Sequence, residues 1–491
     1  MLFRIVTYAV VALLAYTLRQ SPFIQNLPFH LVPPDLPAQL ARLPHGGAVQ
    51  EAFTAHSSAT LASTDRLAYC EDAVHLAGSD GRELVLVSCD PSRKRWNTVM
   101  GPLADARAGK GALWVVDPLA PQEHAVDRVH LEWAALDRGE VEFHPLGVAV
   151  HRDEHTGHAR LFVVNHRAAL STVEVFSLLA PVSASALAAR ATHLLTLSHP
   201  TFTGAPNSIA LLSPTSFFLS HDHHYTRRTR SLWGKLANLV ETVDALPYSR
   251  VDYVDFGGPA AAAGASTPAP AVRVTPVARG LAFANGLALA PDARTLVVAS
   301  TTRRELLFFD VDAPPPISTA APVLTLRRTV KLPMLVDNLS LVEADTASSS
   351  SRSSSGGRAL RVLAAGHPSY PALLSTARSL NLRVRLPGPL REWARTLGND
   401  KWAEWEVAWR WAEQRGMSWV VEVRDPAAPP SVAGAEGDEL ETVYQSNGRI
   451  GEGGFGGSTT AVAGRGGAEG EERAWMVVAG LYEEGVRVIR E

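Results

Sequence analysis

Oxygen-bearing side chains stand where several short apolar segments of this chain begin. The set comprises Glu71, Asn207, Asn285, Asp337 and Asn338. Together these residues offer two carboxylates and three amide oxygens, a mixture suited to calcium, which binds about six to eight oxygens in flexible geometry. The two negative charges match the ion, and an unfilled coordination position could hold a substrate oxygen. The residue types therefore predict a calcium site, provided that the fold brings them together.

A second interpretation applies to each of these residues taken singly. Asn, Asp and Gly are also the residues that tight turns prefer, and Asn285 is followed by a glycine in the sequence Ala-Asn-Gly. Glu-Asp and Asp-Asn pairs are equally common in surface turns. Their recurrence at the ends of separate apolar segments supports a shared metal site, while the interpretation as separate turns stays open.

The elements that would position these residues are short β-strands. Leu281–Asp312 predicts a tight turn, an alternating strand, a Pro-Asp-Ala-Arg turn and two further strands. Similar strand-like segments recur from Glu83–Ser88 to Trp475–Arg490. This repetition predicts an all-β fold, a propeller of about six four-stranded blades. The central ends of the inner strands of a propeller converge on one axis, so residues distant in sequence can meet there.

Composition sets outer limits on the class of protein. The chain has 491 residues, an apolar share of 46% and a net charge of −3. The length allows two or three domains, although a propeller of this size forms a single one. The small charge, with both signs interspersed, gives no nucleic-acid footprint.

The N-terminal segment predicts targeting to the secretory pathway. Arg4 precedes an apolar run from Ile5 to Leu18, and Arg19 follows. The run is short for a spanning helix and typical of a signal-peptide core or a signal anchor. We expect a signal peptide or anchor over 1–22, a Pro-rich connector over 23–59 and the propeller over 60–491. The protein is expected to be secreted or anchored in an endomembrane.

Several insertions interrupt the strand pattern. Helices are expected within 227–246, where Leu232, Leu236 and Leu239 recur at helical spacing, and within the Trp-rich segment 371–417. These apolar faces either pack on the propeller or form a lid that touches a membrane or lipid surface. Small and polar residues predict flexible loops at 257–271, 346–358, 427–437 and 451–470.

The chain has two cysteines, Cys70 and Cys89. The segment between them reads as a hairpin that turns at Ser79-Asp80, with Gly78 facing Gly81. Counting outward from this turn places Cys70 opposite Cys89 and predicts a cross-strand disulfide. The alternative is a pair of free thiols.

Five segments, in order along the chain, resemble the serum paraoxonase/arylesterase family. They are LFVVNHRAALSTVEVF at 161–176, PNSIALLSPTSFFLSHDHHY at 206–225, FANGLALAPD, LVDNLSL and GHPS. The resemblance runs from about Glu71 to the C-terminus, interrupted by the insertions. It implies a six-bladed propeller with two central calcium ions that hydrolyses lactones, aryl esters and sometimes organophosphates.

The resemblance also implies roles for individual residues. Ligands of a catalytic calcium, which polarises the carbonyl and stabilises the oxyanion, fall on Glu71, Asn207, Asn285, Asp337 and Asn338. Ligands of a second, structural calcium fall on Asp72, the Val148 carbonyl and Ser208. Because the family has an aspartate where this chain has Ser208, the second ion should bind weakly, if at all.

The family's water-activating histidine pair falls on Leu146 and His166. Leucine cannot accept a proton, so this pair is broken here, and His166 is left to act alone or with a substitute. His367, His144 and His223 are the candidates for that substitute, and each could instead be structural. The family also closes its ring with a disulfide between the first and last strands. With no cysteine near the C-terminus, this chain must close by strand pairing.

The sequence thus predicts a calcium-dependent hydrolase of lactones or aryl esters, that is, an arylesterase or lactonase with a small-molecule substrate. One alternative is a propeller enzyme like gluconolactonase or strictosidine synthase. Another is a non-catalytic, calcium-stabilised propeller used for binding, and Leu146 is its best support.

Overall fold

The computed structural model describes residues 49–53, 67–78, 81–104, 106, 111–121, 124–133, 141–153, 158–181, 187–257, 271–312, 320–342, 360–368, 373, 377, 417–425, 440–446, 455–466 and 473–490. The predicted signal peptide or anchor and the predicted loops 346–358 and 427–437 lie outside this set. So do nearly all of the predicted loop 257–271 and of the helical insertion 371–417. Within the described residues, no helix is long and apolar enough to cross a membrane.

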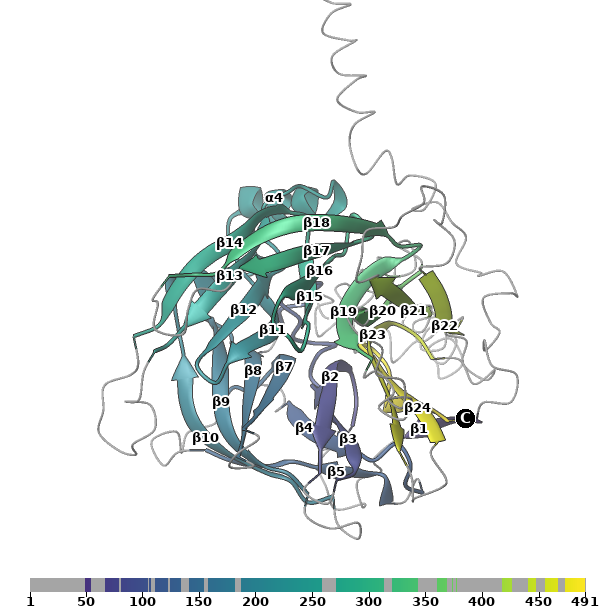
Figure 1. Ribbon diagram of the computed structural model, residues 1–491. Helices are drawn as coiled ribbons and strands as arrows, with labels where there is room; N and C mark the ends of the chain where they lie inside the picture. The colour runs from purple at the N-terminus through teal and green to yellow at the C-terminus, as the bar shows by residue number, and fades with distance from the viewer. Residues whose placement is uncertain are drawn as a thin grey trace, which may run out of the picture.

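Six antiparallel sheets surround a central axis, so the predicted six-bladed propeller is confirmed (Figure 1). The first sheet contains β2 (Cys70–Ala77), β3 (Glu83–Cys89), β4 (Ala112–Val116) and β5 (Val126–Arg128). The second contains β7 (Pro145–Arg152), β8 (Ala159–His166), β9 (Ser171–Leu179) and β10 (Arg190–Leu197), with β6 (His130–Glu132) added in parallel to β10. The third contains β11 (Pro206–Ser213), β12 (Ser216–His221), β13 (Ser249–Asp255) and β14 (Arg273–Leu281).

The remaining three sheets continue the same order around the ring. The fourth contains β15 (Ala284–Leu289), β16 (Thr295–Ser300), β17 (Glu305–Asp312) and β18 (Val323–Lys331). The fifth contains β19 (Leu335–Leu341), β20 (Leu360–His367), β21 (Ser418–Asp425) and β22 (Leu440–Ser446). The sixth contains β23 (Ser458–Gly466), β24 (Arg473–Gly480), β25 (Val486–Arg490) and β1 (Val49–Phe53).

The hydrophobic core lies between neighbouring sheets. Leu86 and Leu113 of the first sheet pack with Phe176 of the second, and Phe308 of the fourth packs with Val362 of the fifth. Middle strands therefore have both faces covered, as in the fully buried β12. Each fully buried side chain of this kind contributes about 1.5–3 kcal/mol, which fixes the blades around the axis.

The ring closes by strand pairing. β1 pairs antiparallel with β25, from Val49 opposite Arg490 to Phe53 opposite Val486. The predicted connector 23–59 was therefore wrong over 49–53, because the exposed edge of β25 offers backbone donors and acceptors that an extended segment can satisfy. A second link joins the two ends of the propeller, since Gly485 donates its backbone N–H to the Leu67 carbonyl at 2.7 Å.

The predicted flexible loop 451–470 was also wrong in its middle part. Ser458–Gly466 forms β23, the inner strand of the sixth sheet. The glycines flanking this segment suggested a loop, but Thr460, Ala461 and Val462 are buried between neighbouring sheets and supply the packing that stabilises a strand.

Glycine permits the inner strands to approach one another closely. A Cβ atom on Gly286 in β15 would lie 2.6 Å from the Asn338 Cα atom of β19, and one on Gly147 in β7 would lie 2.1 Å from the Asn207 carbonyl oxygen of β11. Contacts this short exclude any side chain. These two glycines therefore let the strands that carry the candidate ligands lie side by side.

Among the described residues, the connections between strands include the helical elements η4 (Pro200–Thr203) and α4 (Leu232–Val243). The 3-10 helix η4 precedes β11, and α4 falls within the predicted helical insertion 227–246. The polar side of α4 faces the protein, since Glu241 accepts the backbone N–H groups of His224 and Tyr225, each at 2.8 Å. Its apolar side is open, with Leu232 81% and Trp233 80% exposed.

Candidate metal centre

Irregular strand pairing marks the start of all six inner strands. The register between the inner strand and its neighbour shifts between Pro206 and Ile209 in β11, between Ala284 and Leu287 in β15, and between Val336 and Leu339 in β19. The residues left out of regular pairing include Asn207, Asn285, Asp337 and Asn338. Shifts also occur in β2, β7 and β23. A bulge re-aims side chains and is common beside active sites, so these bulges turn the candidate ligands out of the regular pleat.

Hydrogen bonds connect the candidate ligands of different blades. The Asn338 side-chain amide donates to Glu71 Oε1 at 3.1 Å, which links β19 to β2 across the ring closure. The Asn285 amide donates to Asp337 Oδ1 at 2.6 Å, which links β15 to β19. All five predicted ligands are buried. Glu71 and Asn338, which are 267 positions apart in the sequence, are thus in direct contact.

Four oxygens of this cluster have no hydrogen-bond partner among the described residues. They are Glu71 Oε2, Asn207 Oδ1, Asn285 Oδ1 and Asn338 Oδ1, and all are buried. Leaving a buried acceptor unsatisfied costs roughly 1–3 kcal/mol, and four on one set of predicted ligands require an explanation. The amide N–H groups of Asn285 and Asn338 face neighbouring carboxylates, which leaves their carbonyl oxygens available. An oxygen-seeking cation would satisfy all four, so the residues present fit calcium.

The electrostatics of the cluster point the same way. Burial, followed by the negative charges of Asp72 and Asp337, raises the pKa of Glu71 well above its ordinary value. A divalent cation would remove this repulsion. No group of three or more His, Cys, Asp or Glu side chains with metal-binding geometry occurs in the described part of the chain. The candidate centre therefore depends on amide oxygens, which a search for charged ligands overlooks.

The residues predicted for a second, structural calcium are arranged differently. Asp72 Oδ1 accepts the Ala73 backbone N–H at 2.9 Å and the Thr460 hydroxyl at 3.1 Å, while Oδ2 accepts the Val148 N–H at 2.8 Å. Burial raises the pKa of Asp72 to about 7. The Ser208 hydroxyl accepts the Leu287 N–H at 3.1 Å. Donors of the protein thus engage Asp72 and Ser208, and Asp72 links β2, β7 and β23, while the second calcium site stays a prediction.

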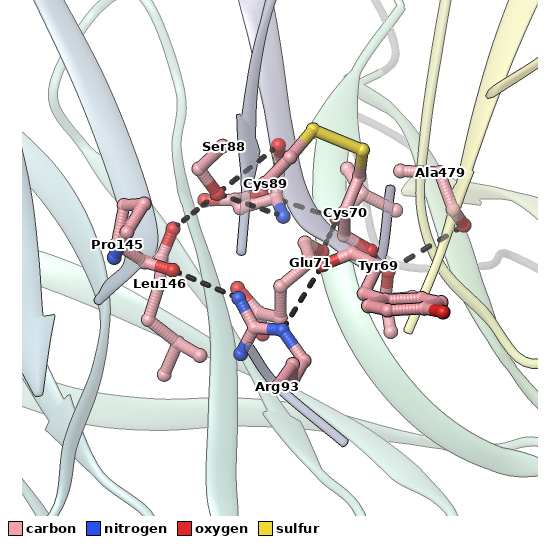
Figure 2. The surroundings of a disulfide bond; sticks show 12 residues. Tyr69, Cys70, Glu71, Ser88, Cys89, Arg93, Pro145, Leu146 and Ala479 are labelled. Atoms are coloured by element: carbon pink, nitrogen blue, oxygen red, sulfur yellow. Dashed lines mark hydrogen bonds between the residues drawn. A yellow bond between two sulfur atoms is a disulfide. The ribbon is translucent and has the colours of Figure 1, made fainter. Parts of the chain in front are cut away.

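The predicted disulfide is present between Cys70 and Cys89, directly before Glu71 (Figure 2). The two cysteines pair across β2 and β3, although the predicted turn was wrong by one residue. Gly78 faces Arg82 rather than Gly81, since its N–H donates to the Arg82 carbonyl at 2.8 Å. The bulge that contains Glu71 shifts the register back by one residue and brings Cys70 opposite Cys89.

His166 lies at the end of β8 with both ring nitrogens engaged. Its Nε2 donates to the Pro206 carbonyl at 2.6 Å, and the Thr98 hydroxyl donates to its Nδ1. Burial, followed by the positive charge of Arg228, lowers the pKa of His166 well below its ordinary value. The neutral ring therefore holds the residue that precedes Asn207. Leu146 is buried in the apolar cluster between the second and third sheets, and its carbonyl accepts the Ser88 hydroxyl at 2.6 Å (Figure 2).

His367, at the end of β20, differs from the other candidate histidines. Its Nε2 donates to Asp337 Oδ2 at 3.1 Å, and its buried Nδ1 has no hydrogen-bond partner among the described residues. His144 contacts Asp90 and the Ala106 carbonyl, each at 2.7 Å. Among the four candidates, His367 has a free ring nitrogen. The remaining candidate, His223, contacts Asp222 at 3.0 Å and Thr242 at 2.7 Å, so both of its ring nitrogens are engaged.

Sequence reasoning missed two features of the site. Tyr69 and Phe283 have left-handed backbones, with φ of 57° and 54°, a conformation that costs a non-glycine residue roughly 1–2 kcal/mol. They precede Glu71 and Asn285 by two residues each, so strained backbone leads into two of the ligands. The buried Arg93 was also missed. Its place in the basic run Ser-Arg-Lys-Arg gives no signal that one arginine turns inward.

A six-bladed propeller with a buried cluster of carboxylate and amide oxygens at the starts of its inner strands defines the structural class. Residues 106–350 match the family model described as Arylesterase. Over these residues the chain belongs to the arylesterase family, so the expected relationship to the paraoxonases and arylesterases is confirmed. The matched residues include Asn207, Asn285, Asp337 and Asn338, whereas Glu71 and His367 lie outside them.

Individual proteins show the same relationship. The chain is 27% identical over 231 residues to serum paraoxonase/arylesterase 1 of Mus musculus, covering 47% of this chain and 54% of that protein. It is 26% identical over 204 residues to serum paraoxonase/arylesterase 2 of Gallus gallus, covering 42% and 47%. The chain thus spans about half the length of these relatives.

Among solved structures, a luciferin-regenerating enzyme matches with a TM-score of 0.40 and 10% identity over 90% of this chain and 95% of that one. The periplasmic gluconolactonase PpgL of Pseudomonas aeruginosa matches with a TM-score of 0.35 and 12% identity over 84% and 87%.

Proposed function

We propose that this protein is a calcium-dependent hydrolase of aryl esters and lactones. The observation that carries the proposal is the set of four buried, unpartnered oxygens on Glu71, Asn207, Asn285 and Asn338. Membership of the arylesterase family over 106–350 supports a hydrolase of this general type. The specific activity and the calcium dependence are the parts that we propose.

Glu71, Asn207, Asn285, Asp337 and Asn338 would hold the ion. Calcium at this position would polarise the substrate carbonyl and stabilise the oxyanion that forms during hydrolysis. Asn338 and Asn285 orient the carboxylates through the hydrogen bonds at 3.1 and 2.6 Å. These bonds fix the ligand set before substrate binds, which reduces the reorganisation needed during the reaction.

Proton transfer falls to His367 in this proposal. Asp337 accepts its Nε2–H at 3.1 Å, which fixes the ring tautomer and leaves the Nδ1 lone pair free. A positioned base must have such a free nitrogen to take a proton from water. His166, predicted as a catalytic residue, has the positioning role instead, because both its nitrogens are engaged and it binds the Pro206 carbonyl next to Asn207.

The exposed apolar side of α4 supports contact with a lipid surface as part of the same proposal. Leu232, Trp233 and Leu236 are 81%, 80% and 48% exposed, and Lys235 lies on the same helix, a combination suited to a membrane interface. Together with the predicted N-terminal signal segment, it supports a secreted or endomembrane-anchored protein. Reduced binding of a Leu232→Ser, Trp233→Ser variant to lipid vesicles would support the proposed lipid contact, and unchanged binding would contradict it.

A non-catalytic, calcium-binding propeller is the second candidate, favoured by Leu146 at the position of a family histidine. One experiment separates the two. Hydrolysis of phenyl acetate and of γ- and δ-lactones is measured with calcium and after chelation, together with calcium binding by calorimetry. Turnover that disappears with chelation and in Asn285→Ala supports the hydrolase. Calcium binding without turnover of any substrate supports the binding protein.

A further inference from the structure

Arg93 is a buried cation beside the candidate metal centre. It lies four residues after the disulfide-bonded Cys89 and is 4% exposed. Its Nε donates to the Tyr69 carbonyl at 3.0 Å, and its Nη2 donates to the Pro145 carbonyl at 2.8 Å. Both acceptors are neutral. Among the described residues, no carboxylate forms an ion pair with this guanidinium.

The hydrogen bonds of Arg93 are incomplete. A guanidinium carries five N–H donors, and two of them are used here. The other three donate to no described residue. A neutral amide has two N–H donors and could make both existing bonds, so linking Tyr69 to Pro145 does not require a positive charge. The charge of Arg93 acts on two buried carboxylates, Asp90 and Glu71, neither of which forms an ion pair with it. The guanidinium therefore keeps N–H donors that a further anionic acceptor could use.

Arg93 lies close to the candidate metal ligands. Figure 2 shows the guanidinium beside both Leu146 and Glu71. Its positive charge acts on Glu71, the first candidate ligand, and on His166. The guanidinium therefore lies beside the site proposed for ester hydrolysis, and Leu146, which follows its acceptor Pro145, has an apolar side chain that offers no acceptor.

A second incompletely paired guanidinium acts on the same histidine. Arg228 donates from Nη2 to the Arg167 carbonyl and to the Ser171 hydroxyl, each at 2.9 Å. Its Nε and Nη1 atoms are buried and have no hydrogen-bond partner among the described residues. Its positive charge is the strongest charge effect on His166, ahead of that of Arg93. Arg93 and Arg228, two cations with unused donors, thus both lower the pKa of His166, which binds the carbonyl of the residue before Asn207.

We propose that Arg93 is a specificity-determining residue that binds a carboxylate group of the substrate, so that the substrates are anionic esters or lactones. The inference rests on the proposed hydrolase function. A carboxylate matches the planar fork of a guanidinium and can accept two parallel N–H donors. Calcium would balance the charges of Glu71 and Asp337, which leaves Arg93 available to an anionic substrate.

The test compares charged and neutral substrates. Phenyl hydrogen succinate carries a carboxylate on the acyl side, 4-acetoxybenzoate carries one on the leaving group, and phenyl acetate carries none. Arg93→Gln keeps donors for the two carbonyls but removes the charge. We expect the KM of at least one anionic ester to rise tenfold or more in this variant, while the KM of phenyl acetate changes less than twofold. Equal effects on all three esters would overturn the proposal.

Two controls keep the test decisive. Arg294→Met removes an exposed arginine at the far end of the β15–β16 hairpin and should leave all three KM values unchanged. Arg93→Lys keeps the charge and loses the fork, so it should raise the anionic KM less than Arg93→Gln. If Arg93→Gln fails to fold, as judged by circular dichroism, the Arg93→Lys comparison decides alone, and equal KM values for Arg93→Lys and wild type overturn the proposal.

Binding separates this inference from the proposed function. Calorimetry with benzoate, against benzamide as the neutral match, measures anion binding to the calcium-treated protein without any turnover. If no ester is hydrolysed but benzoate binds and Arg93→Gln weakens that binding tenfold, the anion site stands and the hydrolase does not. If esters are hydrolysed and benzoate binds both proteins equally, the hydrolase stands and the role of Arg93 is rejected.

Discussion

The imidazole of His367 donates from Nε2 to Asp337 Oδ2 at 3.1 Å and keeps Nδ1 without a partner among the described residues. The same carboxylate accepts the Asn285 amide on its other oxygen at 2.6 Å. Asp337 therefore joins a candidate metal ligand to a histidine with an available lone pair. His166, whose nitrogens are both engaged, lacks that lone pair.

This difference predicts that His367→Gln lowers kcat for phenyl acetate more than His166→Gln does. General-base catalysis contributes roughly 10²–10⁴-fold, so we expect a loss of about 100-fold for His367→Gln with little change in KM. Stopped-flow or initial-rate assays at saturating calcium measure the effect. Calcium affinity is measured in parallel, because loss of a residue that orients a ligand weakens metal binding about 10–100-fold.

The two histidine variants control for each other, since both remove a buried imidazole. A larger kcat loss in His166→Gln than in His367→Gln would contradict the assignment and would return the base function to His166. Loss of calcium affinity without loss of kcat at saturating calcium would assign His367 a purely orienting role.

The buried oxygens predict that calcium stabilises the fold. An ion that binds only the native state at 100 times its Kd contributes about 2.7 kcal/mol. For a domain of this size we expect chelation to lower the thermal midpoint by about 5 °C. Differential scanning calorimetry measures the shift, and Asn285→Ala should abolish it.

Asp292→Ala, in the exposed turn at the other end of the β15–β16 hairpin, is the matched control and should keep the full calcium-dependent shift. A thermal midpoint that does not respond to calcium in the wild-type protein would contradict the predicted metal centre, whatever the catalytic activity.

The propeller could be predicted from sequence because its signals are local. Turn residues at regular spacing and alternating apolar segments specify strands, and family motifs order them. The pairing of β1 with β25 could not be predicted, because it depends on the backbone groups at the edge of β25, which the folded sixth sheet presents to a segment more than 400 residues earlier in the chain. β23 was missed for a similar reason. Its glycine-flanked segment becomes a strand through packing between its neighbours.

The candidate site divides in the same way. Residue types predicted the ligand set Glu71, Asn207 and Asn285, because oxygen donors recur at strand starts. The bulges that re-aim these side chains, the free Nδ1 of His367 and the inward turn of Arg93 depend on register and on contacts across blades. Nothing in the residue types of Ser-Arg-Lys-Arg distinguishes the buried Arg93 from the exposed Arg95.

A buried network around Glu174 predicts a specific pH dependence of stability. Five donors bind its carboxylate, and they come from Asn165, Arg167, Thr172, His193 and Thr196. Burial alone would raise the pKa of Glu174, but the hydrogen bonds, that of His193 first, and the charge of Arg167 lower it from 4.5 to about 2. The folded-state pKa is depressed, so the stabilisation is present above pH 4.5 and is lost as the pH falls toward 2. It amounts to roughly 3 kcal/mol.

Chemical denaturation of wild type and Glu174→Gln from pH 7 to pH 2.5 measures this contribution. We expect the difference in unfolding free energy to be largest at neutral pH and to shrink as the pH falls below 4.5. Glu441→Gln, which removes an exposed carboxylate paired with Arg424, should change the unfolding free energy by about 1 kcal/mol or less. A difference that stays constant over the whole pH range would contradict the prediction.

The Cys70–Cys89 disulfide predicts a link between redox state and metal binding. It closes a loop with a sequence separation of 19, for which chain entropy gives about 3 kcal/mol of stabilisation. Glu71 lies in the bulge directly after Cys70, so the disulfide also restrains a candidate ligand. In a Cys70→Ala, Cys89→Ala variant we expect the unfolding free energy to fall by about this amount and the calcium Kd to rise about tenfold, or roughly 1.4 kcal/mol.

Calorimetric calcium titration and denaturant unfolding of this double variant measure the two effects separately. Unchanged calcium affinity together with lower stability would show that strand pairing and the Asn338 amide, which donates to Glu71 Oε1 at 3.1 Å, hold Glu71 without the disulfide. Asn338→Ala in the double variant then provides the decisive comparison. If the disulfide and this amide restrain the same side chain, the two changes together weaken calcium binding by more than the sum of their separate effects, because either restraint compensates for loss of the other.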